Sequence, residues 1–102
     1  MPDGVRRVRI DESVKIIPAR AFLFRRLINV EFHDRVERIK RGAFANCFPL
    51  RLIKLLGVKV IEREAFCSCT DLSEVEFGDK LETIEQRAFL HCTSLRNNCA
   101  IC

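Results

Sequence analysis

The chain repeats a short alternation of apolar and polar positions four times. Each copy is an apolar–polar–apolar triplet, and the copies begin at Val8, Val30, Ile53 and Val75. This alternation is typical of a short strand that buries one face. Because more than 20 residues separate successive triplets, hairpins are excluded and we expect the strands to pair in parallel.

A second set of apolar positions follows each triplet with the same period. A Val or Leu lies three residues before an Ile, and an Ala-Phe pair then follows; the Phe residues are Phe22, Phe44, Phe66 and Phe89. In the last three copies a Cys and then a Leu follow at steps of three, which suits a short helical or irregular turn. The pattern predicts a repeat solenoid of about four units of 22–23 residues, with parallel strands on one side and turns on the other.

The repeat resembles a known family. The stretch "AFCSCTDLSEVEFGDKLETIEQRAFLHCTSL" is similar, almost position for position, to the BspA-like leucine-rich repeats. The resemblance covers about residues 8–95, so we expect residues 1–102 to form a single leucine-rich-repeat domain. It implies a curved, non-enzymatic scaffold that binds other proteins, often in surface-exposed or adhesive roles. The first unit, "AFLFRRLINVEF", lacks the Cys and one residue, so its turn is expected to be distorted.

Composition narrows the class of protein. With 48% hydrophobic and 31% charged residues, the chain is apolar enough to fold. It has neither the long apolar run of a membrane span nor the apolar stretch of a signal peptide, which favours an intracellular protein. We expect no enzyme and no cofactor, since His33 and His91 are better explained as solvated loop residues than as catalytic groups.

The cysteines follow the repeat rather than a redox or metal motif. Cys47, Cys69 and Cys92 share one repeat position, so we expect a column of buried, reduced thiols that behave as small hydrophobes. Cys67, Cys69 and His91 are the candidate metal ligands, but a matching second pair is absent and we expect no metal.

The final residues, "CAIC", have two interpretations. They match a prenylation box on Cys99, which would make the protein a membrane-recruited adaptor. Residues 99–101 also fit the apolar–polar–apolar strand of a fifth unit, which we favour because so short a box arises often by chance and "SLRNN" before it supplies one basic residue. Membrane association is therefore not expected unless Cys99 is prenylated.

Charge is distributed unevenly along the chain. Residues 1–51 hold 12 Lys and Arg against 6 Asp and Glu, a balance of +6, and residues 52–102 hold 6 against 8, a balance of −2. A basic half favours an acidic partner, but the absence of Trp and Tyr argues against nucleic acid. Two outward columns alternate in sign, and we expect them to fix the order of the units; they are Arg9, Glu31, Lys54, Glu76 and Lys15, Glu37, Lys59, Glu82.

One unit breaks the polar pattern of the strand face. By alternation Leu52 and Leu56 point outward, on either side of Lys54. Two exposed leucines can be ordinary surface; the sharper hypothesis is a contact patch for a protein partner or a second copy of the chain, together with Glu31 and Glu76 on the neighbouring strands. A second copy of the chain is a further candidate partner, because the layer of Phe89, Cys92 and Leu95 is expected to leave an exposed apolar end.

Overall fold

The structure is a computed structural model that describes residues 6–95. The chain there forms short strands joined by turns; they are β1 (Arg6–Arg9), β2 (Ile16–Ile17), β3 (Leu27–Glu31), β4 (Arg38–Ile39), β5 (Leu52–Leu55), β6 (Val60–Ile61), β7 (Glu74–Phe77) and β8 (Thr83–Ile84). Within these residues there is no helix. The turns are therefore irregular, and the helical alternative is not realised.

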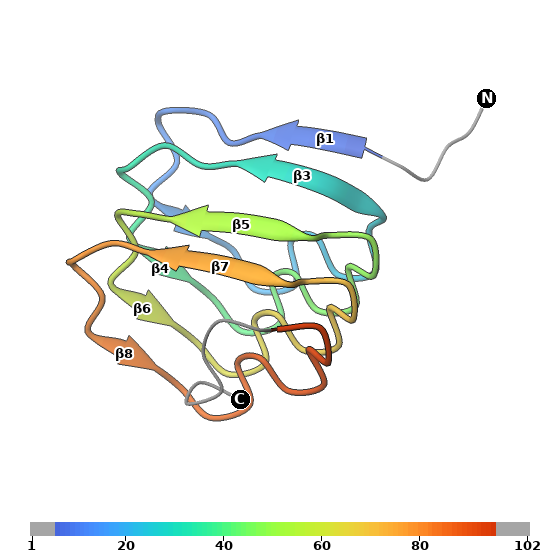
Figure 1. Ribbon diagram of the computed structural model, residues 1–102. Coiled ribbons are helices and arrows are strands. Elements are labelled where there is room, and N and C mark those ends of the chain that lie inside the picture. Colours follow the sequence, from blue (N-terminus) through green and yellow to red (C-terminus); the bar gives the residue numbers. More distant parts are fainter. Residues whose placement is uncertain (1–5, 96–102) are drawn as a thin grey trace.

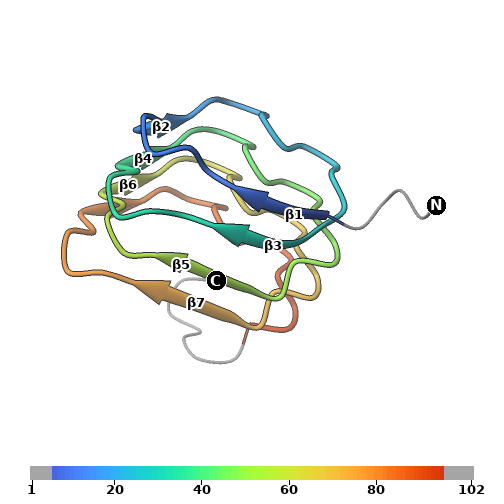
Figure 2. The same ribbon diagram turned by 90° about the horizontal axis from the view of Figure 1, so that it is seen from above.

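The strands stack into a solenoid of four coils, each made of one odd-numbered and one even-numbered strand (Figures 1 and 2). Coil 1 carries β1 and β2, coil 2 carries β3 and β4, coil 3 carries β5 and β6, and coil 4 carries β7 and β8. Every strand pair is parallel, as the sequence predicted. The even-numbered strands form one continuous sheet in the order β2-β4-β6-β8.

The turn that carries Ala-Phe also pairs from coil to coil. Backbone N–H groups of one coil donate to carbonyls of the next, for example Phe22 to Ala43 and Phe44 to Ala65. Two positions in each turn have positive φ between 58° and 65°; they are Arg20, Phe24, Gly42, Asn46, Glu64, Ser68, Arg87 and His91. Left-handed residues at a fixed step explain why these segments are neither helix nor strand.

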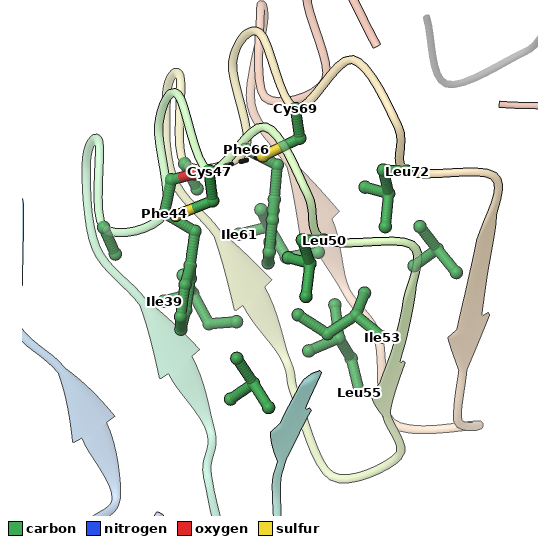
Figure 3. Close-up of a cluster of buried hydrophobic side chains, with 14 of the residues drawn as sticks. Ile39, Phe44, Cys47, Leu50, Ile53, Leu55, Ile61, Phe66, Cys69 and Leu72 are labelled. Carbon is green, nitrogen blue, oxygen red and sulfur yellow. Dashed lines mark hydrogen bonds between the residues drawn. The ribbon is translucent and has the colours of Figure 1, made fainter. Parts of the chain in front are cut away.

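Columns of like side chains fill the space between the sheets. The four Phe rings form one stack with centroids 5.0–5.3 Å apart, and Phe44 and Phe66 are fully buried (Figure 3). Cys47 and Cys69 lie at one end of this layer, and the Leu and Ile columns lie on its strand side. The apolar periodicity of the sequence therefore corresponds to one contiguous core.

The odd-numbered strands do not form one sheet. β1 pairs with β3, and β5 pairs with β7, but β3 and β5 belong to separate sheets although they lie next to one another (Figure 1). The β1–β3 register shifts so that Arg6 pairs with Leu27 and Arg7 with Asn29, which leaves Ile28 as an extra residue. A bulge of this kind bends the strand and disrupts its ladder, so we attribute the split between β3 and β5 to it.

The two end coils differ from what the sequence led us to expect. Phe89 and Cys92, expected at an exposed apolar end, are buried. At the other end Phe22 is only half-buried, and Phe24 is 64% exposed. Leu95, the third residue of the predicted end layer, is half-buried, and self-association through that layer stays a prediction.

Candidate partner-binding surface

A groove lies on the outer face of the molecule where the sheet is split. It encloses about 370 Å³ and is lined by Asn29, Val30, Glu31, Phe32, Leu52 and Lys54, and we call it the β3–β5 groove. Val30 is buried and Phe32 half-buried, and with Leu52 they are the apolar residues of the lining. Glu31 and Lys54 supply one charge of each sign from opposite walls.

The charges around the groove come from neighbouring strands in register. Glu31 accepts from Arg9, with Arg9 Nε 3.3 Å from Glu31 Oε1. Lys54 lies opposite Glu76 across the β5–β7 pair, yet these two side chains form no ion pair in the structure. Among the described residues the alternating column on this face thus yields one ion pair, and at the split Glu31, which is paired with Arg9, forms no ion pair with Lys54.

Leu52 and Leu56 are exposed, as the alternation predicted. Their exposed fractions are 37% and 49%, well above those of the buried neighbours Ile53 and Leu55. Leu52 lines the groove, whereas Leu56 lies just beyond the end of β5. Each of the five predicted binding residues therefore belongs to β3, β5 or β7 or directly follows β5, and three of them line one groove; those three are Glu31, Leu52 and Lys54.

The sequence did not predict the groove itself or the contributions of Asn29, Val30 and Phe32. Val30 and Phe32 were assigned to the buried face, and nothing indicated that a break in the sheet would open a path to them. One feature of the sequence does coincide with the split. The interval from Val30 to Ile53 is 23 residues, whereas the intervals before and after it are 22, so the strand spacing changes there.

His33, expected as a solvated loop residue, is partly exposed and also has a structural role. The N–H of Arg35 donates to Nδ1 of His33 at 3.0 Å, so Nε2 carries the proton and donates to the carbonyl oxygen of Asp11 at 2.8 Å. The ring thus ties coil 2 to coil 1. His91 is exposed, at a left-handed position of the last turn, in agreement with its prediction as a loop residue.

The buried cysteine column is confirmed, and the structure shows what the thiols do. Each donates its S–H to the carbonyl oxygen of the Phe in the preceding coil: Cys47 to Phe22, Cys69 to Phe44 and Cys92 to Phe66, over 3.0–3.2 Å. Figure 3 shows the bond between Cys69 and Phe44. The neighbouring thiols of Cys47 and Cys92, together with burial, raise the pKa of Cys69 above its usual range. These three thiols and Cys67 are free.

Other candidate sites receive no support within the described residues. In residues 6–95 no group of three or more His, Cys, Asp or Glu side chains is placed to hold a metal ion. The same part of the chain contains no helix long and apolar enough to cross a membrane. Cys99 and the strand predicted at residues 99–101 lie outside the described residues.

Comparison with known proteins agrees with the geometry. The profile of the BspA type Leucine rich repeat region matches residues 4–100 in six copies. A leucine-rich repeat protein from Bacteroides ovatus has a similar structure, with a TM-score of 0.83 and 30% sequence identity; the match covers 89% of this chain and 24% of that one. The chain thus spans about a quarter of that relative, and no curated protein matches it. With this repeat over nearly its whole length and the four-coil solenoid it builds, the chain belongs to the BspA-type leucine-rich repeat family.

Proposed function

We propose that this protein is a non-enzymatic scaffold, a single domain that binds another protein through the β3–β5 groove. The leucine-rich-repeat fold supports an interaction role, because its rigid stacked coils present side chains at fixed spacing. The observation that carries the choice of surface is the groove itself, which opens at the one place where the outer sheet is split.

The chemistry of the groove suggests what it binds. Leu52 and the half-buried ring of Phe32 offer apolar area, and Glu31 and Lys54 offer opposite charges on facing walls. A fitting partner segment places an apolar side chain in the groove, with a basic group near Glu31 and an acidic group near Lys54. Interfaces commonly combine such an apolar anchor with a polar rim. Leu56 and Glu76 would extend the contact along β5 and β7.

The test is capture with the intact chain, followed by quantitative binding of each captured protein. The variant Leu52→Glu places a charge in the groove, and we expect it to weaken binding by about 100-fold, since a buried unpaired charge is costly. The matched control is Ile16→Glu, which changes an apolar residue of β2 that is 49% exposed on the other sheet. Equal binding by wild type and Leu52→Glu, with both folded, would place the interface elsewhere.

Three more specific roles, suggested by the sequence alone, are separate proposals: adhesion or recognition, membrane recruitment and self-association. An adhesive or recognition role is what the family resemblance implies. Membrane recruitment requires a prenyl group on Cys99, which the intact mass of the protein isolated from its own cells would reveal. Self-association through the C-terminal layer is tested by sedimentation at rising concentration, and a monomer at all concentrations would reject it.

A further inference from the structure

Coil 1 carries a second recess, separate from the β3–β5 groove. It encloses about 160 Å³ and is lined by Val8, Ala21, Phe22, Arg25, Arg26 and Leu27, and we call it the coil-1 pocket. It shares no residue with the groove. Val8, Ala21, Phe22 and Leu27 supply apolar surface, and every charged side chain in the lining is an arginine.

The pocket follows from the departure of coil 1 from the repeat. Arg25 stands where the next three coils have Cys47, Cys69 and Cys92, and one residue is missing before Leu27. A long charged side chain cannot occupy the buried position that the Cys residues take in the other coils. Arg25 is therefore exposed. The apolar layer around Phe22 is consequently left partly open in coil 1, whereas the equivalent layers of coils 2 and 3 are closed.

The aromatic stack indicates the shape of an occupant. Phe44 is stacked on both sides, by Phe22 at 5.0 Å with an interplanar angle of 10° and by Phe66 at 5.2 Å with an angle of 6°. Phe22 has one such neighbour, and its ring remains half-buried. A further ring placed by the same step would meet the face of Phe22 that is turned away from Phe44, and the volume of the pocket suits a single aromatic side chain.

The charges indicate what flanks that ring. Arg25 and Arg26 are exposed and form no ion pair with a described carboxylate. Guanidinium groups bind carboxylates through paired, charge-assisted hydrogen bonds. We propose that the coil-1 pocket binds an aromatic side chain flanked by aspartate or glutamate on a protein partner. The ring stacks on Phe22, and the carboxylates pair with Arg25 and Arg26.

This occupant fits better than a nucleic acid, which is the other polyanion that arginines attract. The pocket holds one ring beside two cations, whereas single-stranded nucleic acid binds along a groove of several stacking side chains and phosphate contacts. Within residues 6–95 this chain offers no exposed acidic–aromatic segment that could occupy the pocket of a second copy. Its Glu31-Phe32 and Glu76-Phe77 sequences lie in strands or at their ends, and the two Phe rings pack in the core against Phe44 and Phe89.

The probe for the test is the blocked tripeptide Asp-Phe-Asp, titrated into the intact chain and followed by NMR. We expect saturable shifts at the Phe22 ring and at Nε–H of Arg25 and Arg26, with a dissociation constant of about 1 mM, the range of a small ligand with one anchor. Asp-Ala-Asp and Lys-Phe-Lys are the comparison peptides, and both should bind about tenfold more weakly or not at all. An oligothymidylate of equal charge tests the nucleic-acid alternative.

Matched variants separate binding from folding. The double variant Arg25→Glu/Arg26→Glu should reverse the preference, so that Lys-Phe-Lys binds better than Asp-Phe-Asp. Phe22→Leu keeps apolar bulk but removes the ring, and should weaken binding of Asp-Phe-Asp about tenfold. Phe24→Ala is the control, because Phe24 is exposed in the same turn but does not line the pocket. Equal shifts with all three peptides, stronger binding of the oligonucleotide, or unchanged binding by the charge-reversed variant would overturn the proposal.

Discussion

At the scale of single residues, two glycines hold the coils at their spacing. A Cβ added to Gly57 would overlap the carbonyl oxygen of Asp34 in coil 2, and one added to Gly78 would overlap that of Leu56 in coil 3. Neither glycine has positive φ, so the need is for space rather than for backbone freedom. Gly42 is the opposite case: its φ is +65°, and an added Cβ would meet Arg20 at an ordinary contact distance of 3.4 Å.

We therefore predict that Gly57→Ala destabilises the fold more than Gly42→Ala does. Overlap with the backbone forces the coils apart, and we expect a loss of about 2 to 4 kcal/mol for Gly57→Ala. For Gly42→Ala we expect about 1 kcal/mol, the cost of a left-handed alanine, because Arg20, Glu64 and Arg87 adopt the same conformation in other coils. Urea unfolding of the two variants gives the comparison. Equal losses would mean that the close approach at Gly57 is not required.

The thiols give a second prediction at this scale. Cys47, Cys69 and Cys92 are buried S–H donors, whereas Cys67 is half-buried. In the folded protein Cys67 should react fastest of these four with a thiol reagent, and mass spectrometry of the labelled peptides identifies each position.

The pH dependence sharpens that experiment. Thiolates are the reactive form, and the pKa of Cys69 is raised, so its labelling should not increase between about pH 7 and pH 9, where an ordinary thiol of pKa about 8.5 ionises. Unfolding in urea supplies the control, since all thiols should then react alike. Rapid labelling of Cys69 in the native protein would place the column outside the core.

At the scale of the element, the aromatic stack joins the coils. Phe66 lies between Phe44 at 5.2 Å and Phe89 at 5.3 Å and is fully buried, whereas Phe22 has a single stacked neighbour and is half-buried. The same substitution at these two positions thus removes different amounts of buried area and leaves different cavities.

We predict that Phe66→Ala costs about 3 to 5 kcal/mol and Phe22→Ala about 1 to 2 kcal/mol. A domain of this size has limited stability, so the first variant should be largely unfolded and the second folded. Thermal melts followed by circular dichroism measure both. A cooperative melt of Phe66→Ala at the wild-type temperature would contradict the solenoid core.

Much of the fold could be predicted from the repeat, because strand type, pairing and burial follow from short-range sequence patterns. Val8, Val30, Ile53 and Val75 fix strand type and parallel pairing through alternation and spacing, and the shared position of Cys47, Cys69 and Cys92 fixes their burial. The outward direction of Leu52 and Leu56 follows from the same alternation. These features depend on which neighbours a residue has in sequence and in the next coil.

The split between β3 and β5 is different in kind. We attribute it to the register shift at Ile28 in the β1–β3 pair, whose effect depends on how coils 1 and 2 pack against one another. An inserted or deleted residue can change the conformation of the turn alone, or it can shift the register of the next strand. Sequence spacing does not decide between these two outcomes. The groove and the partial exposure of Phe22 were therefore not predicted, and in the C-terminal layer Phe89 and Cys92 are buried whereas Leu95 is half-buried.

At the scale of the whole molecule, the charged columns contribute less than their alternation suggested. Among the described residues there are two ion pairs: Arg9–Glu31, which belongs to a column and is exposed, and Arg38–Glu62, which belongs to neither column and is part-buried. An exposed pair such as Arg9–Glu31 stabilises a fold by about 0 to 1 kcal/mol. Packing and coil-to-coil hydrogen bonds hold the stack, which leaves Lys54 and the outward groups around the groove available for a partner.

The central claim is that the partner binds at the split in the outer sheet. Backbone amide exchange, measured on the intact chain with and without a captured protein, tests it most directly. We predict that binding slows exchange in residues 29–32 and 52–56, on the two walls of the β3–β5 groove, and leaves β2, β4, β6 and β8 unchanged. Slowed exchange confined to those four strands, with residues 29–32 and 52–56 unaffected, would contradict the account.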